Sequence, residues 1–67
     1  MAVVKVIEIM ADSPVSWEDA TQKAFQEASK TVKNIKSIYV KDMQAIVDNG
    51  KVGSYRVNTK ISFVVGE

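Results

Sequence analysis

The C-terminal segment from Ser54 to Val65 alternates between two kinds of side chain without interruption. A period of two places alternate side chains on opposite faces of an extended strand. One face is mainly apolar and aromatic: Tyr55, Val57, Thr59, Ile61, Phe63 and Val65. The other face is polar and carries two cations: Ser54, Arg56, Asn58, Lys60 and Ser62. The pattern predicts a strand with two chemically different faces, and a short chain can cover only one of them with a helix.

Three elements precede this strand, and the first two are a strand and a helix. Residues Ala2 to Met10 are rich in Val and Ile and predict a first strand, which Ala11 to Pro14 should end. Ser16 then resembles a helix N-cap, with Asp19 placed to reach back to it in a capping box. We expect the helix to run to about Asn34, because small and apolar residues recur along it at three-to-four spacing. This stripe comprises Trp17, Ala20, Ala24, Ala28, Val32 and Ile35.

Residues Ser37 to Val47 predict a second strand, and Val52 to Val65 a third. Asn49-Gly50 between them is typical of a type I′ hairpin, since both residues tolerate positive φ. The expected fold is α+β: one β-α-β-β domain over residues 1–67, with a three-stranded antiparallel sheet packed around one helix. We predict the strand order 1-3-2, with the most regular strand in the centre.

Composition narrows the classes of function. A chain of 67 residues is near the lower limit for folding alone and usually needs a staple. There is no cysteine, so disulfides are excluded, and without histidine as well the usual zinc or haem sites are not expected. Oligomerisation is the stabilising device that remains. The net charge of +1, without blocks of like charge, favours neither nucleic acid nor membrane as a partner. Without a signal-peptide pattern or a bilayer-spanning run, a cytoplasmic protein is expected.

Nothing in the sequence indicates an enzyme. No nucleophile and base stand at a recognisable spacing, and the three glycines do not form a phosphate-binding loop.

The motifs along the chain resemble those of the dodecin family, in order and without a large gap. They are Val4-Lys5-Val6-Ile7-Glu8, Ser13-Pro14-Val15-Ser16-Trp17-Glu18-Asp19-Ala20, Thr31-Val32-Lys33-Asn34-Ile35, Asp48-Asn49-Gly50, Tyr55-Arg56-Val57 and Lys60-Ile61-Ser62-Phe63. The resemblance implies a sheet wrapped around one helix and a hollow homododecamer. It also implies a binding or storage role, with riboflavin or FMN as the usual ligand.

Two positions depart from the flavin-binding pattern. Where those members carry a tryptophan that stacks on the flavin ring, this chain has Ser37, which offers no π face. Where they carry a glutamine that hydrogen-bonds the ring edge, this chain has Arg56, which has no acceptor. The chain is more similar to dodecins that lack the tryptophan, of which one type is described as calcium-binding.

Further candidates for a ligand site or an interface are Tyr39, Lys60 and Lys5. Tyr39 shares a strand face with Ser37, and Trp17 is expected to pack rather than bind. Arg56 is expected at a contact between subunits, with intersubunit salt bridges to Glu8 or Asp42 as the structural alternative. The carboxylates match no known metal motif: Asp12, Glu18, Asp19, Asp42, Asp48 and Glu67.

Two functional hypotheses follow. The first is a small-ligand binding and storage protein that forms a hollow homododecamer. The second is a structural assembly without flavin that binds a divalent cation such as calcium.

Overall fold

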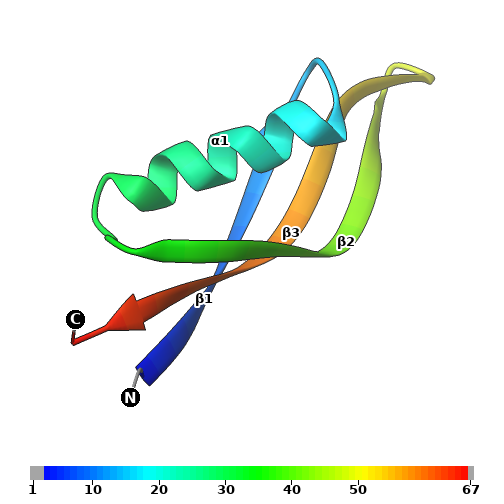
Figure 1. The fold of residues 1–67 in the computed structure, drawn as a ribbon. Coiled ribbons are helices and arrows are strands. Elements are labelled where there is room, and N and C mark those ends of the chain that lie inside the picture. The colour runs from blue at the N-terminus through cyan, green and yellow to red at the C-terminus, as the bar shows by residue number, and fades with distance from the viewer. Residues whose placement is uncertain (1–2, 67) are drawn as a thin grey trace.

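The computed structural model describes residues 3–66, which form one helix and three strands. The elements are β1 (Val3–Ser13), α1 (Trp17–Ser29), β2 (Ile35–Asp48) and β3 (Lys51–Val65). The strands make one antiparallel sheet in the order β1-β3-β2, and α1 lies across one of its faces (Figure 1). The predicted α+β class, strand order and central position of the last strand are confirmed. We call the sheet face beneath α1 the inner face and the opposite one the outer face.

The start of α1 follows from side-chain capping. The Ser16 hydroxyl accepts a hydrogen bond from the Asp19 amide at 3.0 Å, which confirms the predicted N-cap. The predicted return bond from Asp19 to Ser16 is wrong. The Asp19 carboxylate instead accepts from the Ser13 hydroxyl at 2.6 Å, and that hydroxyl accepts from the Ser16 amide. The bonds from Ser13 and then Lys23 hold the pKa of Asp19 below its ordinary value.

Several element boundaries differ from the prediction. The predicted start of the first strand at Ala2 lies outside the described residues, but its end at Met10 is wrong. β1 continues to Ser13 because β3 still offers pairing partners, and pairing outweighs the low strand propensity of the last residues. α1 ends at Ser29 rather than at the predicted Asn34, and Asn34, with a left-handed φ of 62°, lies outside the helix. Ile35 therefore begins β2 instead of extending the helical stripe.

The hairpin between β2 and β3 has the predicted turn chemistry. Asn49 and Gly50 both have positive φ, at 53° and 74°. This is the backbone that a type I′ turn requires, so the turn prediction is confirmed.

The core between α1 and the inner face is small. The helix contributes Ala20, Ala24 and Ala28, and β3 contributes Val57 and Ile61, all at most 3% exposed. Thr59 is also fully buried between these two β3 residues, and its hydroxyl donates to the Ile9 carbonyl at 2.8 Å. The apolar face of β3 thus packs against the helix, as its alternation predicted. The small alanine side chains let α1 lie close to the sheet.

The protomer is elongated rather than spherical. It measures 51 × 19 × 13 Å, and its radius of gyration of 13.6 Å exceeds the value of about 11 Å expected for a compact domain of this length. The β2–β3 hairpin extends beyond the start of α1, and the outer face is left without a covering layer (Figure 1). A single chain therefore leaves much of its sheet unpacked.

Candidate functional site

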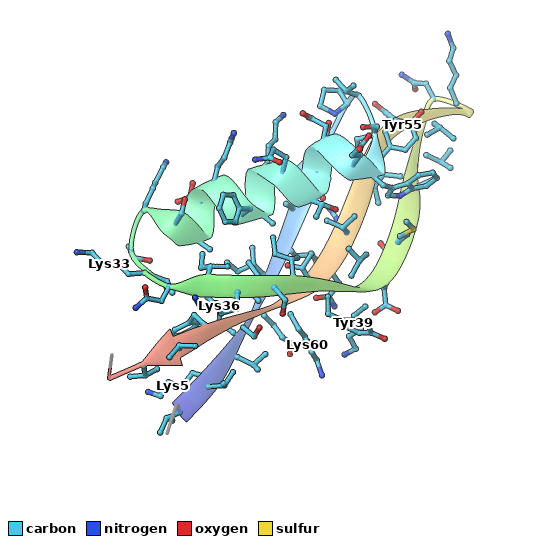
Figure 2. The ribbon with its side chains drawn as sticks, in the orientation of Figure 1. Lys5, Lys33, Lys36, Tyr39, Tyr55 and Lys60 are labelled. Carbon is cyan, nitrogen blue, oxygen red and sulfur yellow. The ribbon has the colours of Figure 1, made fainter. Side chains whose placement is uncertain are left out.

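The candidate residues lie mainly on the outer face, where cross-strand pairing arranges them in rows. One row contains Glu8, Lys60 and Tyr39, and the next contains Met10, Asn58 and Asp42. A third row contains Asp12, Arg56 and Gln44. Figure 2 shows Tyr39 and Lys60 on the side of the sheet away from α1. These rows thus form a mainly polar surface drawn from all three strands, interrupted by the exposed Met10.

Arg56 is held by a partner within its own chain. Its Nε donates to Asp12 Oδ1 at 2.7 Å and its Nη2 to Asp12 Oδ2 at 2.9 Å, so the contact is bidentate. These hydrogen bonds lower the pKa of Asp12 and raise that of Arg56. This contact lies within one chain, so the intersubunit salt bridges to Glu8 or Asp42 suggested by the sequence stay a prediction. Asp12 was missed because the first strand was expected to end before it.

Ser37 and Arg56 do not meet within one chain. Ser37 pairs with Ser62, and their hydroxyls are hydrogen-bonded to each other. Ser62 lies six positions from Arg56 along β3, which corresponds to about 20 Å of extended strand. Any ligand that contacts both positions would therefore have to be large or be held between two copies of the chain.

The other candidates are distributed over both faces. Tyr39 is 65% exposed and pairs with Lys60 on the outer face, and it shares that face with Ser37 as predicted. Lys41 reaches Glu8 with Nζ–Oε2 at 3.6 Å, so Glu8 is engaged by a lysine of β2. Lys5 pairs with Phe63, in the inner-face register, and does not join the outer rows.

Trp17 has a structural role, in agreement with the expectation that it packs. Its ring meets Tyr55 edge to face, with centroids 5.0 Å apart and an interplanar angle of 71°. Its indole N–H donates to the Gln44 carbonyl at 2.9 Å. Because Tyr55 belongs to the inner-face set, this indole offers no platform on the outer face.

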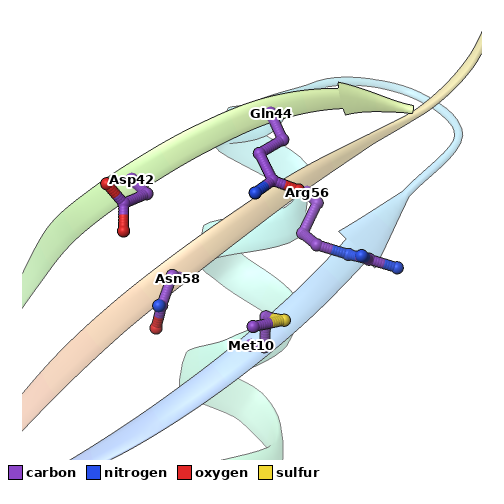
Figure 3. Close-up of a pocket in the computed structure, with 5 residues that line it drawn as sticks. All are labelled: Met10, Asp42, Gln44, Arg56 and Asn58. Carbon is purple, nitrogen blue, oxygen red and sulfur yellow. The ribbon is translucent and has the colours of Figure 1, made fainter. Parts of the chain in front are cut away.

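A shallow pocket on the outer face was not foreseen. It is lined by Met10, Asp42, Gln44, Arg56 and Asn58 (Figure 3). Its volume of about 30 Å³ is room for an ion or a few waters, not for a ring ligand. The signal in the sequence was present in part, because Arg56 and Asn58 were already placed on the polar face.

Metal-ligating side chains do not gather in the part of the chain that the structure describes. Within residues 3–66 no three acidic, histidine or cysteine side chains come together, and Glu67 lies outside the described residues. The same residues include no helix long and apolar enough to cross a membrane.

This fold defines a small α+β module with one helix over a three-stranded sheet and an uncovered, mainly polar sheet face. The chain belongs to the dodecin family, since residues 3–66 match the sequence model of that family. Dodecins are small-ligand binding proteins and not enzymes. Over 63 residues the chain is 38% identical to the calcium dodecin of Mycobacterium tuberculosis, covering 94% of this chain and 89% of that one.

Solved structures agree with this assignment. The M. tuberculosis calcium dodecin, described as having a calcium-binding site, superposes with a TM-score of 0.83 at 38% identity, covering 91% of this chain and 87% of that one. A variant of the Thermus thermophilus dodecin gives 0.93 at 27% identity and covers both chains completely. A dodecin from Streptomyces davaonensis gives 0.92 over 98% of this chain and 97% of that one, and at 23% identity it supports the fold alone.

Proposed function

We propose that this protein is a homododecameric storage or buffering dodecin that binds a divalent cation, calcium first, rather than a flavin. The observation that carries the proposal is that both side chains at the family's flavin-contacting positions, Ser37 and Arg56, already have partners within the chain. Ser37 is bonded to Ser62, and the Arg56 guanidinium is closed on Asp12. The relationship to a calcium dodecin supports the choice of cation.

Assembly is supported by the incompleteness of the protomer. Its accessible surface is 4823 Å², whereas a folded monomer of this mass exposes about 4,200 Å². Among residues 3–66 five apolar residues are buried, three of them alanine, which is a small core for a domain of this size. Burying the exposed apolar side chains of β1 (Val3, Val4, Val6 and Met10) against other copies would supply the missing apolar contact.

Flavin binding lacks its two expected contacts. A serine side chain has no π face, so a stacking contribution of about 1 kcal/mol beyond area burial is absent. A guanidinium has only donors, and here its fork is occupied by a carboxylate. An isoalloxazine ring would therefore meet neither a stacking partner nor a free amide.

The test has two parts, both with the full chain. Light scattering at micromolar concentration should give a mass near twelve protomers, and a particle of one protomer would refute the assembly. Thermal unfolding should then be followed with calcium, magnesium, riboflavin and FMN added separately. Calcium should raise the melting temperature and the flavins should not. A rise with FMN together with visible flavin absorbance would instead support the flavin-storage function, and no shift with any ligand would leave only the assembly.

A further inference from the structure

We infer that the outer-face pocket lined by Asp42, Gln44 and Asn58 is the part of the calcium site that each protomer supplies. This inference rests on the proposed function and deepens it by naming the ligating side chains. The three residues come from two strands and face the same shallow cavity (Figure 3).

The donor chemistry of the pocket suits a hard cation. Calcium takes roughly six to eight oxygen ligands, from carboxylates, amide and backbone carbonyls and water. Asp42 offers a carboxylate, and Gln44 and Asn58 each offer an amide oxygen. The remaining ligands must come from water or from a neighbouring copy, which agrees with the absence of a three-acid cluster within residues 3–66.

A β-bulge turns Asp42 toward this pocket. Val40 pairs with Thr59, so an unbroken ladder would place Asp42 opposite Val57, on the inner face beneath α1. The register shift between Val40 and Asp42 instead places Asp42 opposite Asn58, on the outer face. Bulges that re-aim a side chain are over-represented next to functional sites. Here the bulge brings a carboxylate out of the apolar layer and beside an amide.

Two basic residues near the pocket, Arg56 and Lys41, pair with acids other than Asp42. Arg56 is also a lining residue of the cavity, but its guanidinium extends toward β1 and binds Asp12 (Figure 3). Lys41 is engaged by Glu8. Among the described residues Asp42 forms no ion pair, whereas the other outer-row acids, Glu8 and Asp12, each have one. A cation would therefore find one carboxylate whose charge is not already matched.

Lys60 is the competing charge. It lies one row from Asp42 on β3, and in the described residues it makes no ion pair of its own. Its ammonium should weaken calcium binding through repulsion between like charges. Removing that charge should therefore strengthen the site, which offers a gain-of-function test.

The experiment is calorimetric titration of calcium chloride into the assembled full chain at low ionic strength. Asp42→Asn should weaken calcium binding at least tenfold. Asp48→Asn, which removes one carboxylate beside the hairpin turn, is the matched control and should leave affinity within twofold. Lys60→Gln and Gln44→Glu should each tighten binding at least threefold, a result that misfolding cannot produce.

The outcomes separate the inference from the proposed function. If the unmodified protein binds calcium and Asp42→Asn binds as well as Asp48→Asn, the pocket assignment is overturned and the proposed function stands. If Asp42→Asn fails to assemble, the two tightening variants decide, and unchanged affinity in both overturns the assignment. If the unmodified protein does not bind calcium at all, the proposed function and the pocket assignment both fall.

Discussion

Replacing Ile61 with alanine tests how much the small core beneath α1 stabilises the protomer. Ile61 is 0% exposed and lies in β3 between Ile7 of β1 and Ile38 of β2. The substitution removes three carbons, which is about 2.4 kcal/mol of transfer free energy at about 0.8 kcal/mol per carbon. The cavity adds to this, so the expected loss in free energy of unfolding is about 4 kcal/mol.

That loss is large against the stability of a chain this short. A domain of 67 residues is expected to have a free energy of unfolding of roughly 3–10 kcal/mol. The Ile61→Ala protomer should therefore depend on its contacts with other copies, and its unfolding midpoint should rise with protein concentration. Ile61→Val, which removes one carbon, should cost about 1 kcal/mol and serves as the graded control.

Urea unfolding at two protein concentrations provides the assay. Trp17 is the only tryptophan, and its fluorescence reports directly on the inner face because it packs on Tyr55. The reasoning would be refuted if Ile61→Ala cost no more than Ile61→Val at both concentrations. In that case the contact between α1 and β3 would not be the main source of stability in the protomer.

Three further predictions concern the outer face. Arg56→Glu should disrupt assembly, measured by light scattering, far more than Lys23→Glu does. Lys23→Glu is the control because it makes the same change of charge on the exposed side of α1. If both variants assemble like the unmodified protein, Arg56 does not lie at an interface. Ser37→Trp combined with Arg56→Gln should raise FMN affinity at least tenfold by fluorescence quenching, and no gain would mean that the pocket differs more widely from flavin-binding dodecins. Because Arg56 lowers the pKa of Asp12, their pair stabilises the fold above the unfolded-state pKa of about 3.9 and loses this effect as pH falls through the lower folded-state pKa. The difference in melting temperature between the unmodified protein and Arg56→Gln should shrink below about pH 4, and a constant difference would contradict the ion-pair assignment.

The candidate site was predictable only in part. The alternation of β3 placed Arg56 and Lys60 on the polar face, and the structure agrees. The partner of Arg56 was not predictable, because Asp12 follows the residues with strong strand propensity and joins β1 only through pairing with β3. The sequence did not assign Asp42 to a face of the sheet, because the β-bulge before it interrupts the alternation of side chains on which such an assignment depends.

The sequence by itself determined the class of fold, the faces of the central strand, the hairpin turn and the helix N-cap. These features depend on residues close together in the chain, through side-chain period, turn chemistry and capping. The tertiary structure alone decided that Arg56 binds Asp12, that Asp19 binds Ser13, and that Asp42 faces outward beside Asn58. The physical reason is register: a shift of one residue reverses every face of a strand, and register depends on the pairing partner rather than on the strand alone.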